Sequence, residues 1–262
     1  MKNVTNRKFA IVARPDGESG HLEKRLKEIL LKEGMIYDEE HPEIVFPIGG
    51  DGTFIYAIHK YIDVVSDLYF YGICSGTLGF FAEYNADEFD TFVDVFLKGE
   101  VKDTVFPLLR AEMDGVKHYG LNEIRIENPA RTQILDIYIN DEKLETFHGS
   151  GMNVCTQLGS SAYNRSLGGA VIQEGLDLIE MCEIAGIHHS KFHSLYAPFI
   201  LKGDTVITFA SQSFEGAVMG IDAAVIPLYG NSPIEIRVSR TKRVHMLKGR
   251  QITYIDRLHT LF

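Results

Sequence analysis

Residues 43–53, Glu-Ile-Val-Phe-Pro-Ile-Gly-Gly-Asp-Gly-Thr, decide the fold of this chain. The apolar run at 44–48 is typical of a buried strand, the glycines are typical of a tight turn, and the spacing of apolar residues over 54–58 is helical. This order predicts an anion site. Glycines let the backbone approach a phosphate, and the first turn of a helix adds free N–H groups and a positive dipole end.

Asp51 is the one carboxylate in this turn. A negative side chain in a phosphate cradle is costly unless it binds a metal, orients a hydroxyl or accepts a proton. The alternative is a residue that only caps the N-terminus of the helix. The local pattern leaves both interpretations open.

The first hundred residues alternate between strand and helix patterns. We expect strands at 9–13, 44–48 and 68–73. We expect helices at 51–61 and 86–97, and a first helix whose apolar residues recur over 22–31 and which ends at Gly34. This alternation predicts a doubly wound, Rossmann-like α/β domain with a parallel sheet. Ligands bind beyond the carboxyl ends of such strands, where both Gly49–Thr53 and the second glycine-rich turn at 76–81 fall.

After residue 100 the pattern changes to short alternating segments separated by turns. We expect strands at 105–113, 121–127, 134–140, 151–155, 205–209 and 234–239. The predicted organisation is an α/β domain over 1–100 and a β-rich nucleotide-binding domain over 101–239. The tail, 240–262, is expected to return to the first domain as a strand or helix.

Composition excludes several classes of protein. The chain has 262 residues, and a hydrophobic content of 45% argues against a disordered protein. Its formal charge of −10 argues against a general binder of nucleic acid or anionic membranes, because such partners would be repelled. The three cysteines, Cys74, Cys155 and Cys182, lie far apart and fit reduced thiols in the cytoplasm. We see no signal peptide and no stretch long enough to span a bilayer.

Two polar stretches stand out in the β-rich part. Asn122 and Glu123 could hold an adenine edge and a ribose diol, or could be a turn cap and a solvated carboxylate. Residues 156–170 are rich in hydroxyls and glycines; Ser160 could cap a short helix carrying Tyr163, or the segment could be ordinary loop packing. Asp222 could be functional or could shape a turn.

The histidines at 188, 189 and 193 suggest a metal site but lack cysteine or acidic ligands at zinc spacing. We expect a surface loop there.

Taken together, these stretches resemble the NAD kinase family, in matching order over nearly the whole chain. The motifs that carry the resemblance are Gly49-Gly50-Asp51-Gly52-Thr53, Gly76-Thr77-Leu78-Gly79-Phe80, Asn122-Glu123, and Gly159-Ser160-Ser161-Ala162-Tyr163 with Ser166 and Gly168-Gly169. The first motif alone is shared with lipid and sugar kinases. Its occurrence with the others is specific.

The resemblance implies a reaction in which the γ-phosphoryl group of ATP, or of inorganic polyphosphate, is transferred to the 2′-hydroxyl of the adenosine ribose of NAD, giving NADP. A divalent cation such as Mg²⁺ is implied, with no ligand residue that we can assign. A homo-oligomer, dimer or tetramer, is implied as well.

The resemblance also implies a role for each matched residue. Asp51 would be the base or the orienter of the hydroxyl. The phosphate-binding residues would be Gly49, Gly50, Gly52 and Thr53. The residues binding NAD would be Asp51, Gly52, Phe80, Asn122, Glu123, Ser161, Ala162, Tyr163, Ser166 and, from a neighbouring subunit, Ala185 and Ile187.

Four residues depart from the family pattern. Ser150, toward the nicotinamide end, stands where the family usually has an acid, and Gln157, at the start of the loop, stands where it has a proline. Ser161 replaces a threonine, and Ala223 follows Asp222 where some relatives carry a larger polar residue. Losing the proline is expected to loosen the start of the loop. These departures leave two alternatives, a weak or inactive NAD(P)-binding homologue and a lipid or sugar kinase that shares only the first turn.

Overall fold

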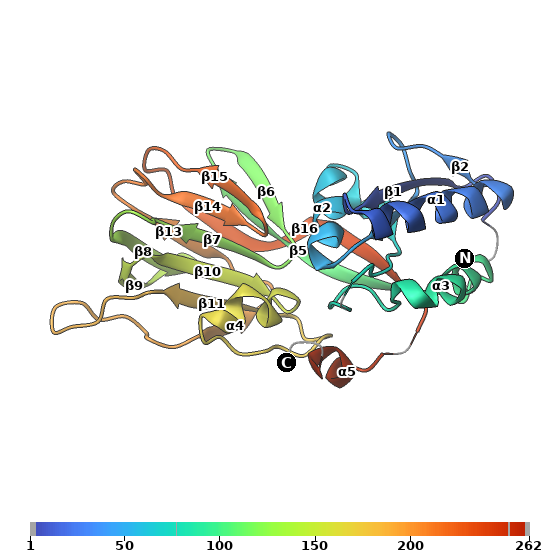
Figure 1. The fold of residues 1–262 in the computed structure, drawn as a ribbon. Coiled ribbons are helices and arrows are strands. Elements are labelled where there is room, and N and C mark those ends of the chain that lie inside the picture. Colours follow the sequence, from blue (N-terminus) through green and yellow to red (C-terminus); the bar gives the residue numbers. More distant parts are fainter. Residues whose placement is uncertain (1–3, 77, 251, 260–262) are drawn as a thin grey trace. The chain divides into compact units, whose positions relative to one another are not determined.

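The computed structural model describes residues 4–76, 78–250 and 252–259 (Figure 1). Within these ranges the chain forms two compact units. The first comprises the residues up to 106 together with those from 241 onward, and the second comprises residues 107–240.

The first unit is built on a parallel sheet. Its strand order is β2 (Ile36–Tyr37), β1 (Lys8–Ala13), β3 (Ile44–Ile48), β4 (Tyr69–Phe70) and the end of β16 (Ile234–Lys248), where His245 and Met246 pair with β4. The helices are α1 (Gly17–Lys32), α2 (Asp51–Lys60), α3 (Phe89–Leu97) and α5 (Tyr254–His259), with 3₁₀ turns η1 (Val65–Asp67) and η2 (Ala86–Glu88). The predicted doubly wound α/β part is confirmed.

Helices cover both faces of this sheet because its strands are apolar on both sides. The face that carries Phe9 and Phe46 packs against the apolar stripes of α1 and α3. The residues that alternate with them, Ala10 and Val45, are also buried, and α2 contacts β1 and β3. The turn before α2 directly follows β3, so it lies at the carboxyl end of this parallel sheet.

One predicted strand, 68–73, is shorter in the structure. Tyr71 and Ile73 still donate backbone hydrogen bonds to the carbonyls of Val45 and Pro47, both at 3.0 Å. Pro47 has no N–H to return to this segment, so the ladder is interrupted after β4 and resumes only at an isolated bridge between Ile48 and Ile73. This bridge lays the second glycine-rich segment beside the first.

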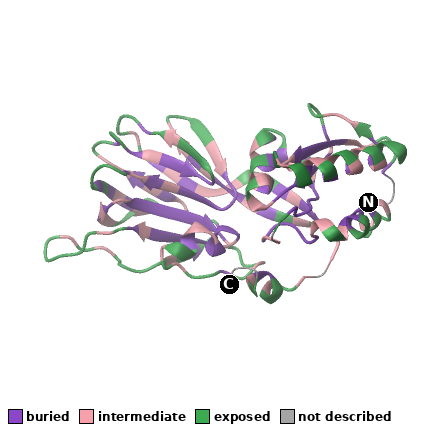
Figure 2. Cartoon of the chain, viewed as in Figure 1, coloured by how far each residue is buried: buried purple, intermediate pink, exposed green. Residues whose placement is uncertain are grey.

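The second unit is an antiparallel β-sandwich. One sheet has the order β12 (Phe199–Lys202), β11 (Leu178–Ile184), β10 (Gly151–Thr156), β7 (Glu123–Glu127), β14 (Val218–Ile221) and β15 (Ala224–Pro227). The other joins the start of β16 to β13 (Ile207–Ala210), β8 (Gln133–Ile139) and β9 (Glu142–Gly149), with β5 (Lys102–Met113) paired to β16 and to β6 (Val116–Gly120). The inward-facing residues of both sheets form one buried core, and Figure 2 shows buried strands with exposed connections.

The predicted β-rich part is therefore confirmed, but local patterns missed six of its strands: β6, β9, β11, β12, β14 and β15. The predicted strand 234–239 is the first part of β16, which continues to Lys248. Its continuation is rich in Arg and Lys, which hides the alternation that marks a strand. The tail forms α5.

Phe46 is fully buried, and its ring lies 5.0–6.4 Å from those of Phe9, Tyr71, Phe92 and Phe96. We expect Phe46→Ala to lower the free energy of unfolding by about 3–5 kcal/mol, because the cavity cannot close around so many rings. Urea denaturation followed by circular dichroism measures the change. Leu31→Ala, on the exposed side of α1, is the matched control and should change it by less than about 0.5 kcal/mol. Equal losses in the two variants would contradict the packing described.

Candidate functional site

Asp51 is the first residue of α2, but it does not cap that helix. The N-cap position is Gly50, and no side chain caps the helix. The Asp51 carboxylate instead accepts the backbone N–H of Phe80, 2.9 Å from each oxygen, and that of Phe81 at 3.1 Å. The two glycine-rich segments are therefore joined through this carboxylate, and the capping interpretation is wrong.

Two glycines are required for this arrangement. A Cβ on Gly79 would lie 2.3 Å from Oδ1 of Asp51, so any other residue would displace the carboxylate. Gly49 has a φ of +156°, and a Cβ there would lie 2.3 Å from Oγ1 of Thr53. At Gly50 and Gly52 an added Cβ would meet no described atom within 4 Å, so the turn has open space at the start of α2.

Phe80 takes part in this site through its backbone N–H, which binds Asp51, while its ring packs within the protein. The side chain is buried and meets the ring of Tyr254 edge-on, with centroids 6.1 Å apart. Arg14 lies on the other side of the turn, where its backbone N–H donates to the carbonyl of Ile48 and its guanidinium pairs with Asp16, the N-cap of α1. Thr77 lies outside the described residues.

In the second unit, Asp222 organises the bend that carries Asn122 and Glu123. Its carboxylate accepts the backbone N–H groups of Leu121, Asn122 and Glu123 at 2.8, 2.7 and 3.2 Å. Asp222 itself has a φ of +49° and follows β14 directly. Of the two interpretations left open for Asp222, the structure supports the shaping of a turn, because its oxygens are occupied by backbone donors.

The same bend is fixed from a second direction. Thr156 donates its hydroxyl to the carbonyl of Leu121 at 2.7 Å and its N–H to that of Asn122 at 2.9 Å. A Cβ on Gly159 would lie 2.0 Å from the carbonyl oxygen of Asn122, so only glycine fits there. The hydroxyl-rich loop and the Asn122–Glu123 pair, far apart in the sequence, are thereby brought together.

Asn122 and Glu123 retain free acceptor atoms. Both residues are buried, yet Oδ1 of Asn122 and Oε2 of Glu123 have no hydrogen-bond partner among the described residues. Buried polar atoms are rarely left unpaired unless a ligand or water completes them. The pair therefore fits a ligand that donates hydrogen bonds, such as an adenine amino group or a ribose hydroxyl.

Burial dominates the electrostatics of this pair. It raises the pKa of Glu123 to about 7, helped by the neighbouring charge of Asp222 and opposed by Arg125, whose Nη1 lies 3.7 Å from Glu123. Arg125 also pairs with Glu127 at 3.0 Å and lies over the ring of Tyr163. A buried carboxylate with a raised pKa beside unpaired acceptors is typical of a binding site.

The loop from 156 to 170 differs in detail from the prediction. Ser160 lies within the 3₁₀ turn η3 (Gly159–Ser161), donates to the carbonyl of Gln157 and caps no helix. The short helix α4 (Tyr163–Ser166) starts after it. Tyr163 donates its hydroxyl to Glu127 at 3.1 Å, and Ser166 is exposed.

Gln157, which stands where the resemblance noted above implies a proline, holds the loop through two hydrogen bonds. Its Oε1 accepts the N–H of Gly175 at 2.8 Å, and its carbonyl accepts the hydroxyl of Ser160 at 2.7 Å. The expected loosening of this segment is therefore offset by a side-chain bond that proline cannot make. Ser161, which lacks the methyl of threonine, keeps its hydroxyl on the carbonyl of Leu158 at 3.2 Å.

A buried polar network that sequence reasoning missed supports this loop. Glu180 is fully buried and accepts from the Asn164 amide at 2.9 Å and from the N–H of Ala170 at 2.8 Å. Asn153 donates to the Oδ1 of Asn164 at 3.2 Å. The only sequence signal was a carboxylate in the middle of an apolar strand, at Glu180.

Ala185 and Ile187 follow β11 and are exposed, with Ala185 at a φ of +46°. Beside them lies a cavity of about 290 Å³ lined by Leu167, Cys182, Glu183, His188, Tyr196 and Pro198. His188 pairs with Glu183 at 3.0 Å. The histidine segment is a surface loop, as predicted, and among the described residues no cluster of three His, Cys, Asp or Glu side chains could hold a metal ion.

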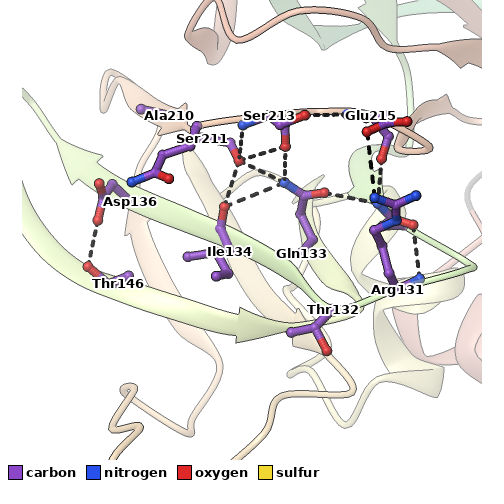
Figure 3. Close-up of a pocket in the computed structure, with 12 residues that line it drawn as sticks. Arg131, Thr132, Gln133, Ile134, Asp136, Thr146, Ala210, Ser211, Ser213 and Glu215 are labelled. Carbon is purple, nitrogen blue, oxygen red and sulfur yellow. Dashed lines mark hydrogen bonds and ion pairs between the residues drawn. The ribbon is translucent and has the colours of Figure 1, made fainter.

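A second cavity, of about 310 Å³, contains none of the predicted site residues (Figure 3). The amide of Gln133 points toward Ser211 and Ser213 and donates to both, at 2.9 and 3.0 Å, while its oxygen accepts from Asn128. The polar atoms of the Gln133 side chain are therefore used in hydrogen bonds within the protein. The cavity is therefore not the candidate site.

Comparison with known proteins places these features in context. No family model matches the chain. It is 37% identical to an NAD kinase of Lactobacillus acidophilus over 219 residues, covering 82% of each, and 35% identical to NAD kinase 1 of Bacillus cereus over 261 residues, covering 97% of this chain and 98% of the relative.

Solved structures share the fold. An NAD kinase from Archaeoglobus fulgidus in complex with ATP matches with a TM-score of 0.80 at 20% identity, over 97% of this chain and 98% of that one. Yeast NADH kinase complexed with NADH matches with a TM-score of 0.78 at 16% identity, over 98% of this chain and 86% of that one.

Glu123 makes stability depend on pH. Its pKa is higher in the folded state, so between pH 4.5 and about 7 the unfolded chain releases its proton first and unfolding is favoured as pH rises. Glu123→Gln should therefore gain unfolding free energy relative to the parent across this window, by up to about 3 kcal/mol above pH 7, and almost none below pH 4.5. Urea denaturation at a series of pH values measures the difference. Exposed Glu142→Gln is the control, and a gain that is constant with pH would contradict the assignment.

Proposed function

The chain belongs to the NAD kinase family, and from that premise we propose that it transfers the γ-phosphoryl group of ATP to the 2′-hydroxyl of the adenosine ribose of NAD. The observation that carries the proposal for the site is the Asp51 carboxylate. Backbone donors hold it at the open N-terminal end of α2, where it caps nothing.

Asp51 acts as the base in this reaction. As the hydroxyl oxygen attacks the γ-phosphorus, its proton passes to an Asp51 oxygen, the new O–P bond forms, and the bond to the β-phosphate oxygen breaks to release ADP. Oδ1 of Asp51 accepts from both Phe80 and Phe81, which fixes the orientation of the carboxylate, and Oδ2 accepts from Phe80 alone, which leaves it a lone pair for the proton. Phosphoryl transfer depends mainly on positioning, so one fixed carboxylate is sufficient.

The phosphates of the donor bind at the turn before α2. Gly50 and Gly52 supply backbone N–H groups and the positive end of the helix dipole. Gly49 and Thr53 shape this phosphate-binding turn, because their N–H groups donate to the carbonyls of Ile73 and Gly50. The open space at Gly50 and Gly52 supports this role, because a phosphate needs close access to the backbone.

NAD is held by acceptor atoms on the second unit and by residues around the loop. Asn122 and Glu123 receive hydrogen bonds from the adenosine, which the unpaired Oδ1 and Oε2 support. We assign Ser161, Ala162, Tyr163 and Ser166 to the adenine pocket, and we also assign Gly52 and Phe80 to the binding of NAD. Arg125 keeps Glu123 and Tyr163 in place through its contacts with both.

A divalent cation such as Mg²⁺ would neutralise the donor phosphates. Mg²⁺ in phosphoryl-transfer sites is held by one or two carboxylates together with substrate phosphates and water, so a ready-made cage of three protein ligands is not required. The open glycine turn leaves room for the donor phosphates and water that would hold the cation, and we assign no protein ligand to it. When bound, the cation would stabilise charge on the transferring group.

We also propose that the chain works as a homo-oligomer, dimer or tetramer, with Ala185 and Ile187 of a neighbouring subunit completing the NAD site. Both residues are exposed in the single chain, which supports the proposal. Its three cysteines are free and buried, in keeping with a cytoplasmic location. Among the described residues, no helix is long and apolar enough to cross a membrane.

The alternatives from the sequence are less favoured. A lipid or sugar kinase would not be expected to share 35% identity with NAD kinases over nearly its whole length. A weak or inactive homologue was suggested by Ser150 and Gln157, but the Gln157 side chain fastens its loop. Polyphosphate as donor and NADH as acceptor stay open to a direct screen of donors against acceptors.

Asp51→Asn should lower NADP formation from ATP, Mg²⁺ and NAD by about 10²–10⁴-fold, because the amide accepts no proton. NAD binding, measured by calorimetry, should persist. Asp63→Asn is the matched control, since that carboxylate is fully exposed and should leave the rate unchanged. Robust turnover by the Asp51 variant would overturn the role of Asp51, whereas a parent protein that binds NAD but phosphorylates nothing would overturn the proposed function.

Removing divalent cations with EDTA should abolish NADP formation, and added Mg²⁺ should restore it, because the donor phosphates then lose their counter-charge. The thermal unfolding midpoint without nucleotide should stay the same, since no described cluster of side chains holds a structural metal. Full activity in EDTA would contradict the requirement for a cation.

A further inference from the structure

The loop that holds Asp51 is itself held by the C-terminal segment of the chain. Arg257, in α5, is buried, and its Nη1 donates to the carbonyl of Phe80 at 3.4 Å. Lys248, at the end of β16, is also buried, and its Nζ donates to the carbonyl of Phe81 at 3.0 Å. Two cations therefore contact the two residues whose N–H groups bind Asp51.

The geometry at Arg257 forms a continuous chain of hydrogen bonds. The carbonyl of Phe80 and the N–H of Phe81 are the two ends of one peptide group. Arg257 binds the oxygen end, and the nitrogen end donates to Oδ1 of Asp51 at 3.1 Å. A cation on the oxygen polarises the peptide and strengthens its N–H as a donor, more so where water is excluded.

Glu83 fixes Arg257 in this position. Its carboxylate is almost fully buried and accepts from Nη2 of Arg257 at 3.2 Å and from the backbone N–H groups of Gly249 and Arg250 at 2.8 and 3.1 Å. A buried carboxylate with three donors supplies the counter-charge that a buried guanidinium needs. Arg257 is thereby oriented between Glu83 and the carbonyl of Phe80.

We propose that Arg257 is a positioning residue for phosphoryl transfer, acting through the Phe80–Phe81 peptide to hold the Asp51 carboxylate in its reactive orientation. This inference rests on the proposed function, in which Asp51 receives the proton of the hydroxyl. Arg257 acts on Asp51 through the peptide group, so we expect its effect to fall on the rate of the chemical step and not on the binding of NAD.

The kinetic test compares Arg257→Met, Arg257→Lys and a matched control. Arg257→Met should lower kcat about tenfold, the effect of weakening roughly one charged hydrogen bond, with KM for NAD within about twofold of the parent. Arg257→Lys keeps the charge and should recover most of the rate. The control is Arg250→Gln, which breaks the neighbouring Arg250–Glu88 pair (2.7 Å) but no contact to Phe80 or Phe81, and should keep the parent kcat.

Loss of stability is separated from loss of positioning by a second variant. Arg257→Met leaves Glu83 without its cation, which is destabilising for a buried carboxylate. Arg257→Met with Glu83→Gln removes that charge, so the double variant should unfold nearer the parent midpoint and still show the lowered kcat. Recovery of kcat together with stability would overturn the proposal, as would an equal loss in Arg250→Gln.

An amide signal tests the contact without any activity. In protein labelled with ¹⁵N-phenylalanine, the Phe81 amide proton should move upfield in Arg257→Met, because its hydrogen bond to Asp51 weakens, and should stay in place in Arg250→Gln. An unchanged Phe81 resonance would overturn the inference even if the parent is a kinase. Absence of NAD phosphorylation by the parent would overturn the proposed function, while the amide shift still reports whether Arg257 acts on the peptide.

Discussion

The pinning of the Asp51 carboxylate by the N–H groups of Phe80 and Phe81 is the interaction on which the rest of the first unit depends. It requires two loops at the carboxyl end of one parallel sheet, and the bridge between Ile48 and Ile73 lays them side by side. It also requires Gly79, because any side chain there would occupy the space of the carboxylate. The parallel sheet, the crossover helices and the glycine-rich turns can be understood as the means of holding one carboxylate still.

The second unit uses the same physical device with the roles exchanged. Asp222 also receives backbone N–H groups, but there the carboxylate is the support and the bend at Asn122 and Glu123 is the part left free to bind. In both units a charge-assisted bond fixes a short irregular segment that has no regular ladder of its own. The residues at or beside the strand ends, Asp51 in one unit and Asn122 and Glu123 in the other, are thereby held in place.

How far the sequence could predict this site depended on the range of the interactions. The glycine turn at Asp51 and the Asn122–Glu123 pair were predictable because their chemistry lies in adjacent residues. Asp222 and Arg257 contact these segments from about 100 and 177 positions away in the chain, and nothing local marks them as partners. For the same reason the fold class was predictable from periodicity, whereas the end of β16, whose pattern is masked by charged residues, was not.

The pairing of β16 has a consequence for the order in which contacts can form while the chain is being synthesised. The strand pairs through Ile234 and Ile236 with β13 in the second unit and through His245 and Met246 with β4 in the first. During synthesis the second unit, residues 107–240, therefore emerges complete before the first unit receives its last strand and α5. The contacts of Lys248 and Arg257 with the carbonyls of Phe81 and Phe80 can therefore form only after the whole second unit has been synthesised.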